Sequence, residues 1–210
     1  MKKKKSKKNL FINRELSWLS FNERVLQEAI DETTPLIDRL RFLGIYSNNR
    51  DEFYRVRVAS IKRMLVLGKD AIPVMGEKPE KLLESIMQIV IKQQEIFDEI
   101  YQLILIELKK NHIHIINELS LDESQQEFVK KIFDEEILSN LFPILLDETM
   151  SFPYLSDNSS YLFAKLISQK NEKHKKFALI ELPTKTNSRF VILPNKENEQ
   201  YVILLDDVIR

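Results

Sequence analysis

Apolar residues recur every three or four positions up to about residue 111, whereas beyond it short β-branched and aromatic runs alternate with turn-forming residues. The first pattern is typical of amphipathic helices and the second of strands. The change predicts two domains, residues 10–111 and 112–210, preceded by a disordered lysine-rich tail over residues 1–9. We expect an α+β protein. An amino-terminal bundle of about four helices, one of them long, precedes a smaller α/β domain with a mostly antiparallel or mixed sheet.

Three shorter helices are predicted before the long one. The first spans about residues 17–31 and has an apolar face. The second begins at Pro35 and stops at Gly44. The third begins at Asn49, with Glu52 as its capping-box partner, and ends near residue 67. Residues 47–50, Ser-Asn-Asn-Arg, would then form a turn between two helices.

A helix of about 48 Å is predicted over residues 79–110, at 1.5 Å per residue. Its apolar positions step by four and three residues, which is close to a heptad repeat. Such a helix either packs across the bundle of its own chain or contributes a dimer contact. The seam consists of Leu82, Ile86, Ile89, Gln93, Ile96, Ile100 and Leu103.

The second half is predicted to begin with a strand over residues 112–117. Ser120 and Glu123 then form a capping box for a helix that ends near residue 139. Acidic residues after the last strand lead into the first turn of another helix, so we expect the chain to be part of a longer protein. The remaining strands are predicted at residues 142–146, 161–167, 177–182, 190–193 and 201–205.

The net charge of zero hides an uneven distribution, because six of the lysines lie in the first eight residues. The remaining 202 residues carry 26 basic and 32 acidic side chains, a net charge of −6. We expect a cytoplasmic protein without a secretory signal or membrane span. A solvated tail is the simpler interpretation of the lysine run, and peripheral contact with phosphates or an anionic membrane surface is the alternative.

The absence of cysteine excludes disulfides, zinc-thiolate sites and cysteine nucleophiles. The sequence also lacks the glycine-rich phosphate-binding loops and the GxSxG motif. His112 and His114 would share one face of a strand, but no third metal ligand stands at a recognisable spacing. His174, in a lysine-rich turn, is expected to be solvated. The sequence therefore predicts no catalytic residues and no metal site in this chain.

Two polar residues fall on apolar helix faces. Arg57 lies near the middle of an arc of apolar residues, and Asn22 lies among apolar residues of the first helix. A buried guanidinium or amide is costly unless its donors are satisfied. We therefore expect Arg57 to be mostly buried against Glu15 or Glu23, so that Arg57→Ala costs about 3 to 5 kcal/mol. Asn22 is expected to bind a backbone group. The alternative is that one or both face a ligand anion in a cleft.

The predicted turn at residues 47–50 offers side-chain amides, a free helix N-terminus and the guanidinium of Arg50. Such a group suits a polar or anionic ligand. A helix cap is the simpler role for Asn49, because asparagine is among the commonest capping residues.

Two long segments carry a family resemblance: FINRELSWLSFNERVLQEA over residues 11–29 and PLIDRLRFLGIYSNNRDEFYRVRVA over residues 35–59. They closely resemble the amino-terminal domain of the bacterial polyphosphate kinases of the phosphohistidine type. The close match covers about residues 10–65. A looser similarity extends into the first part of the family's second domain, the head domain.

The resemblance implies reversible transfer of the terminal phosphate of ATP to inorganic polyphosphate, through a phosphohistidine and with Mg²⁺. The catalytic histidine and the metal ligands would lie in later domains that this chain lacks, so we expect the isolated chain to be inactive. The resemblance also implies a homo-oligomer with dimer contacts in the head domain. It makes Asn49 a nucleotide-binding residue, and Arg57 and Asn22, singled out by their helix faces, are candidates for a supporting role. Arg50 departs from the apolar residue expected at its position.

Asn49 would hold the nucleotide if its side chain points outward while Asn48 or Ser47 holds the turn. The alternative function is a non-catalytic helical interaction or dimerisation module without a ligand. A nucleic-acid-binding function is disfavoured, because the body of the chain is acidic and its basic residues alternate with acidic ones.

Overall fold

The computed structural model describes residues 12–67, 72, 77–146, 151–167, 175–196 and 198–210. The predicted lysine-rich tail and His174 lie outside the described residues. The chain divides between Leu108 and Lys109 into two compact units. The predicted α+β class is confirmed, because a helical part is followed by a smaller part with one mixed and one antiparallel sheet.

The first helix, α1 (Arg14–Ile30), begins three residues earlier than predicted. The Asn13 side chain causes this, because its oxygen accepts a hydrogen bond of 2.8 Å from the backbone N–H of Glu15 and so caps the helix. Phe21, an apolar residue of this helix, is not part of its buried face, because it is 63% exposed. The buried face consists of Glu15, Leu19, Asn22, Leu26 and Ala29.

The second and third predicted helices form one continuous rod, which corrects the predicted break. The rod consists of α2 (Leu36–Glu52), the π-helical segment η1 (Phe53–Val58) and α3 (Ala59–Met64). Glycine in a helix interior costs only about 1 kcal/mol. Burial of Leu43 and Tyr46 on either side of Gly44 outweighs that cost. The predicted turn at residues 47–50 is therefore wrong, because these residues lie inside α2.

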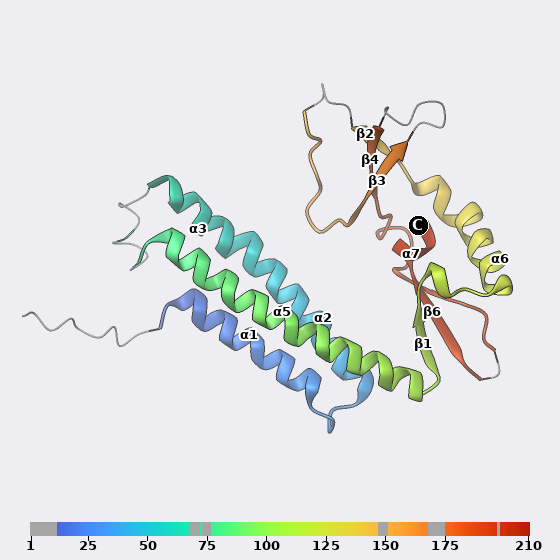
Figure 1. Ribbon diagram of the computed structural model, residues 1–210, viewed down its shortest axis with the longest axis horizontal. Helices are drawn as coiled ribbons and strands as arrows, with labels where there is room; N and C mark the ends of the chain where they lie inside the picture. Colours follow the sequence, from blue (N-terminus) through green and yellow to red (C-terminus); the bar gives the residue numbers. More distant parts are fainter. Residues whose placement is uncertain (1–11, 68–71, 73–76, 147–150, 168–174, 197) are drawn as a thin grey trace, which may run out of the picture. The chain divides into compact units, whose positions relative to one another are not determined.

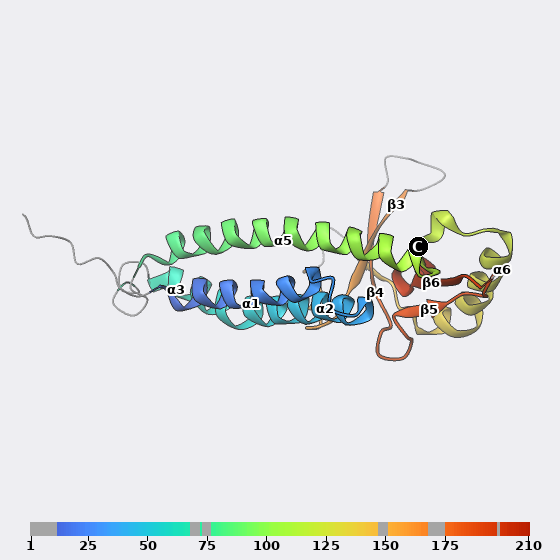
Figure 2. The same ribbon diagram turned by 90° about the horizontal axis from the view of Figure 1, so that it is seen from below.

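The long helix α5 (Pro79–Lys110) is confirmed. It runs beside α1 and α2 in both views (Figures 1 and 2), and its seam packs within its own chain. Near its end the buried positions shift from the heptad to Ile104 and Leu108, whereas Leu103 is exposed. A straight helix of 3.6 residues per turn drifts from a heptad in this way. One apolar core of this unit consists of Leu19, Phe53, Val58, Ile61, Leu82 and Ile86.

The second unit contains a mixed sheet in the order β1-β6-β5. Strand β1 (Ile113–Ile116) runs parallel to β6 (Gln200–Leu204), which runs antiparallel to β5 (Phe190–Ile192). The predicted strands in these places are confirmed with small shifts of their ends. The predicted final helical turn is α7 (Leu205–Ile209). The apolar core of the second unit consists of Val129, Ile137, Leu193, Ile203, Leu205 and Val208.

The predicted helix after β1 is confirmed as α6 (Glu123–Ile132), continued by the π-helical η4 (Phe133–Ile137) and the 3-10 turn η5 (Leu138–Asn140). The predicted capping pair is wrong, because Asp122 and Gln125 form the capping box and Ser120 lies in a preceding 3-10 turn. A second, antiparallel sheet has the order β2-β4-β3. Its strands are β2 (Ile144–Leu146), β3 (Tyr161–Ile167) and β4 (Lys175–Glu181).

Candidate functional site

Three pairs of side chains join α1 to the rod of α2 and η1. Residue numbers rise along one helix as they fall along the other, so the two run antiparallel and successive pairs lie about one turn apart. The three candidate residues from the sequence all belong to this interface. The pairs are the amide pair Asn22–Asn49, the aromatic pair Trp18–Phe53 and the ionic pair Glu15–Arg57.

The amide pair is buried on one side. Asn22 is 1% exposed, donates from Nδ2 to the backbone oxygen of Tyr46 at 3.2 Å and accepts from Nδ2 of Asn49 at 2.9 Å. The prediction that Asn22 binds a backbone group is confirmed. The prediction of Asn49 as a helix cap is wrong, because Asn49 lies in the interior of α2. Its half-buried side chain points toward Asn22 rather than away from the bundle.

Hydrogen bonds extend the amide pair to α5. The Tyr46 hydroxyl donates to Oε1 of Gln93 at 3.2 Å, and Nε2 of Gln93 donates to the backbone oxygen of Leu19 at 3.1 Å and to Glu23 at 3.2 Å. Burial raises the pKa of the Tyr46 phenol, although nearby Arg50 opposes the shift. Tyr46 therefore stays neutral and serves as a hydrogen-bond donor. Side chains of three helices are thus held in one network.

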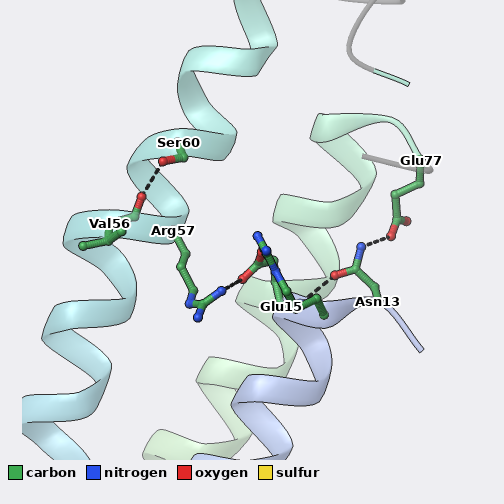
Figure 3. A network of polar contacts seen from close by, with 7 residues as sticks. Asn13, Glu15, Val56, Arg57, Ser60 and Glu77 are labelled. Atoms are coloured by element: carbon green, nitrogen blue, oxygen red, sulfur yellow. Dashed lines mark hydrogen bonds and ion pairs between the residues drawn. The ribbon is translucent and has the colours of Figure 1, made fainter. Parts of the chain in front are cut away.

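The ionic pair lies at the other end of the interface. Nη1 of Arg57 is 2.9 Å from Oε2 of Glu15, and Nη2 of Arg14 is 2.7 Å from Oε1. Figure 3 shows Arg57 reaching from its helix to Glu15, while Nδ2 of Asn13 donates to Glu77 at 2.9 Å. The predicted pairing with Glu15 is confirmed. The predicted burial is too strong, because the Arg57 side chain is 32% exposed.

A cavity of about 810 Å³ explains that exposure. Arg57 lies at its wall, with its guanidinium carbon 5.9 Å from the centre of the Trp18 ring. The Trp18 ring stacks on Phe53 at 4.8 Å. Neither Asn22 nor Asn49 lines this cavity, so the two ends of the interface are separate sites. The lining includes Arg14, Glu15, Trp18, Glu52, Phe53 and Arg57.

The sequence interpretation gave no polar role to three buried residues of the helical unit, Arg39, Tyr46 and Gln93. Arg39 is almost completely buried, donating to the backbone oxygen of Ala29 at 2.9 Å and to Glu107 at 2.7 Å. A signal was present for Gln93, a polar residue in the apolar seam of α5. Arg39 and Tyr46 share one helix face with Leu43 and Phe53. The helix end predicted at Gly44 divided this face between two helices, so the shared face was not recognised.

Arg50, the departure from the family pattern, bridges α2 and α5. Its Nη1 donates to Oε1 of Gln94. Its guanidinium carbon lies 5.4 Å from the centre of the Tyr46 ring and 5.9 Å from that of Phe97. Such cation–π contacts stabilise the packing of an arginine over aromatic rings. The amide pair Asn22–Asn49 next to it keeps its hydrogen bond of 2.9 Å.

The second unit brings His112, which directly precedes β1, together with His114 of β1, so the predicted placement of both histidines on one strand is wrong for His112. Nδ1 of His112 lies 2.7 Å from one oxygen of Glu199, and Nε2 of His114 binds the other oxygen. These hydrogen bonds lower the pKa of the Glu199 carboxyl. Within the described ranges, no group of three or more histidine, aspartate or glutamate side chains is arranged to hold a metal ion.

None of the helices that the structure describes is long and apolar enough to cross a membrane.

Two family models match most of the chain. The polyphosphate kinase N-terminal domain matches residues 11–116, and the polyphosphate kinase middle domain matches residues 124–210.

Curated relatives and a solved structure agree with these models. A polyphosphate kinase of Vibrio parahaemolyticus is 41% identical over 208 residues, covering 98% of this chain and 29% of the relative. That of Escherichia coli K12 is 40% identical over 204 residues, covering 96% of this chain and 29% of the relative. The crystal structure of polyphosphate kinase from Porphyromonas gingivalis superposes with a TM-score of 0.85 at 33% identity, covering 97% of this chain and 30% of that one. The chain thus spans less than a third of the length of these relatives, and it belongs to the polyphosphate kinase family.

Proposed function

We propose that this chain is the nucleotide-holding amino-terminal part of an enzyme that reversibly transfers the terminal phosphate of ATP to inorganic polyphosphate. The observation that carries the proposal is the state of Asn49. Its amide is anchored to buried Asn22 while the residue itself is only half-buried. An anchored, accessible amide is suited to contact the edge of a base, since it offers both a donor and an acceptor.

The proposed division of labour follows from the chemistry of phosphoryl transfer. Such reactions depend mainly on positioning and on neutralising the charge that develops on the phosphoryl oxygens. In this proposal the helical unit positions the nucleotide end of ATP. The remaining part of the enzyme supplies the nucleophilic histidine, the cations and the Mg²⁺ ligands. The isolated chain is accordingly expected to make no polyphosphate from ATP.

Asn22 and Arg57 have supporting roles in this proposal, and these roles differ. Asn22 holds the Asn49 amide, as the 2.9 Å hydrogen bond supports. Arg57 lies 2.9 Å from Glu15, a carboxylate that it shares with Arg14, and we assign Arg57 to stabilising the packing of η1 on α1 rather than to attracting a phosphate.

The test is the substitution Asn49→Ala in the complete enzyme that carries this chain. Loss of the base contact should raise the KM for ATP about two- to tenfold, the value of one hydrogen bond, with a smaller change in kcat. Asn48→Ala is the matched control, because Asn48 is the same residue type one position away and is exposed on α2. An unchanged KM for ATP in Asn49→Ala would refute the nucleotide-binding role and leave Asn49 as a packing residue.

A second proposed role is support of a homodimer through the sheet β2-β4-β3. Phe163 is 60% exposed and stacks on Phe177 at a ring distance of 5.1 Å, and Ile167 on the same strand face is also exposed. Exposed apolar faces of this kind mark interaction surfaces. Sedimentation of the complete enzyme should show a dimer that Phe163→Lys weakens. A dimer unaffected by this change would exclude the sheet as the interface. Dimerisation with no ATP binding would favour the alternative of a non-catalytic interaction module.

A further inference from the structure

Hydrogen bonds determine which way round the Asn22 amide lies. The backbone carbonyl of Tyr46 is solely an acceptor, so the group 3.2 Å from it must be the NH₂ of Asn22. The carbonyl oxygen of Asn22 therefore faces Asn49. That oxygen is also solely an acceptor, so the NH₂ of Asn49 faces it at 2.9 Å. The orientation of both amides thus follows from one backbone carbonyl of α2.

Burial makes this orientation rigid. Asn22 is 1% exposed and Tyr46 is fully buried, with the Tyr46 ring held further by its hydroxyl contact to Gln93. Turning the Asn49 amide by 180° would place its oxygen against the oxygen of Asn22, so that two acceptors would face each other and the hydrogen bond between the amides would be lost. One N–H of Asn49 is thus occupied. Its carbonyl oxygen has no hydrogen-bond partner among the residues that the structure describes.

We propose that Asn22 is a positioning residue that fixes the oxygen of the Asn49 side chain toward the nucleotide base and thereby selects adenine over guanine. This inference rests on the proposed nucleotide-binding role of Asn49.

The selectivity follows from the polarity of the two purines. Adenine carries an amino group at carbon 6, which donates, whereas guanine carries a carbonyl oxygen there, which accepts. A free asparagine amide rotates to suit either base, because its two ends have similar size and opposite polarity. An amide held by Asn22 cannot exchange its oxygen for its NH₂, so a base that faces this oxygen meets only an acceptor. The amide oxygen therefore accepts a hydrogen bond from adenine and repels the oxygen of guanine.

The first experiment changes the nucleotide and leaves Asn22, the residue that orients the amide, in place. The complete enzyme and its Asn49→Ala variant are assayed with ATP and with purine riboside triphosphate, which lacks the amino group at carbon 6. The wild type should lose about two- to tenfold in kcat/KM with the analogue, whereas Asn49→Ala should lose nothing further. If the wild type uses both nucleotides equally well, the proposed orientation is wrong.

The second experiment releases the amide. Asn22→Leu has similar size but no acceptor, so Asn49 becomes free to turn, and the ratio of kcat/KM for ATP to that for GTP should fall about two- to tenfold. Tyr46→Phe is the matched control, because it removes the bond to Gln93 but keeps the backbone carbonyl that orients Asn22. Tyr46→Phe weakens the same core and should leave the ratio of kcat/KM for ATP to that for GTP unchanged.

The outcomes separate the two proposals. An Asn49→Ala enzyme with an unchanged KM for ATP refutes the proposed function itself. A raised KM in Asn49→Ala, together with an unchanged nucleotide ratio in Asn22→Leu, keeps the proposed function and refutes the positioning role. If Asn22→Leu does not fold, the analogue experiment on the intact enzyme decides the orientation.

Discussion

The amide network of the helical unit and the histidine cluster of the second unit join chain segments that are far apart in sequence, but they do so with different chemistry. The first links α1, α2 and α5 through the neutral side chains of Asn22, Tyr46 and Gln93. The second links the start of β1 to the segment before β6 through the carboxylate of Glu199, which binds two histidines.

The difference lies in what each arrangement responds to. The neutral groups of the amide network are buried, so their contribution to stability should be insensitive to salt and constant through neutral pH. The Glu199 cluster is partly exposed and titrates, so its contribution should change with pH. The ionic pair Glu15–Arg57 stands between them, since its carboxylate is buried and its guanidinium is partly exposed.

The largest effect is expected for Asn22→Ala. The change removes the buried hydrogen bonds that Asn22 makes with the Tyr46 carbonyl and with the Asn49 amide and creates a small void, so the free energy of unfolding should fall by about 2 to 4 kcal/mol. Urea unfolding at low and high salt measures it, with the exposed Asn48→Ala as control. The free energy of unfolding should fall by the same amount at both salt concentrations. A strong salt dependence would contradict the view that this network is held by neutral groups.

Arg57→Ala should cost about 1 to 2 kcal/mol, less than the 3 to 5 expected for a fully buried arginine. Arg14 still pairs with Glu15 at 2.7 Å, and a third of the Arg57 side chain is already in solvent. The cost should shrink as salt is added. Lys62→Ala, an exposed cation on the same rod, serves as control. A loss as large as that of Asn22→Ala would mean that the ionic pair behaves as a buried one.

Gly44→Ala should stabilise the helical unit by about 0.5 to 1 kcal/mol, because alanine has the higher helix propensity. A Cβ atom at this position would meet nothing within 4 Å. Thermal unfolding of the variant tests whether α2 runs unbroken to the amide pair. Destabilisation would instead favour the helix end that the sequence pattern predicts at this glycine.

Glu199→Gln should change how the free energy of unfolding depends on pH. The hydrogen bonds from His112 and His114 lower the pKa of this carboxyl in the folded state. The stabilisation is therefore present above about pH 4, where the unfolded carboxyl is ionised, and is lost as the pH falls through the lower folded value. Plots of the free energy of unfolding against pH, from neutral to acidic, should converge for wild type and variant at the acidic end. Parallel curves would show that the cluster does not titrate as described.

The sequence pattern was sufficient for the element types but less so for their ends. Strand β3 and the long helix α5 follow from uninterrupted local periodicity over their whole length. The errors occurred where one local signal was weighed alone. Gly44 suggested a helix end and Asn49 a cap, but both lie in a helix that is held by the burial of Leu43 and Tyr46. Tertiary burial outweighs a propensity difference of about 1 kcal/mol.

The same reasoning separates the predictable part of the site from the rest. Asn22 and Arg57 stand out in the sequence because a polar residue on an apolar face needs a partner. Glu15, 42 positions from Arg57, is one of the two carboxylates expected to pair with it, whereas the pairing of Asn22 with Asn49, 27 positions away, was not expected. Sequence spacing sets the face of a helix that a residue occupies, but not the register between two helices.

What the sequence by itself determined is the α+β order of elements, the family and the residues whose burial demands a partner. The tertiary structure alone decided the continuity of α2, the network through Gln93 and the orientation of the Asn49 amide. The physical reason is the range of the forces. Periodicity and helix propensity act between neighbours along the chain. Hydrogen-bond polarity across a helix interface depends on which backbone carbonyl the packing brings within 3.2 Å of Asn22.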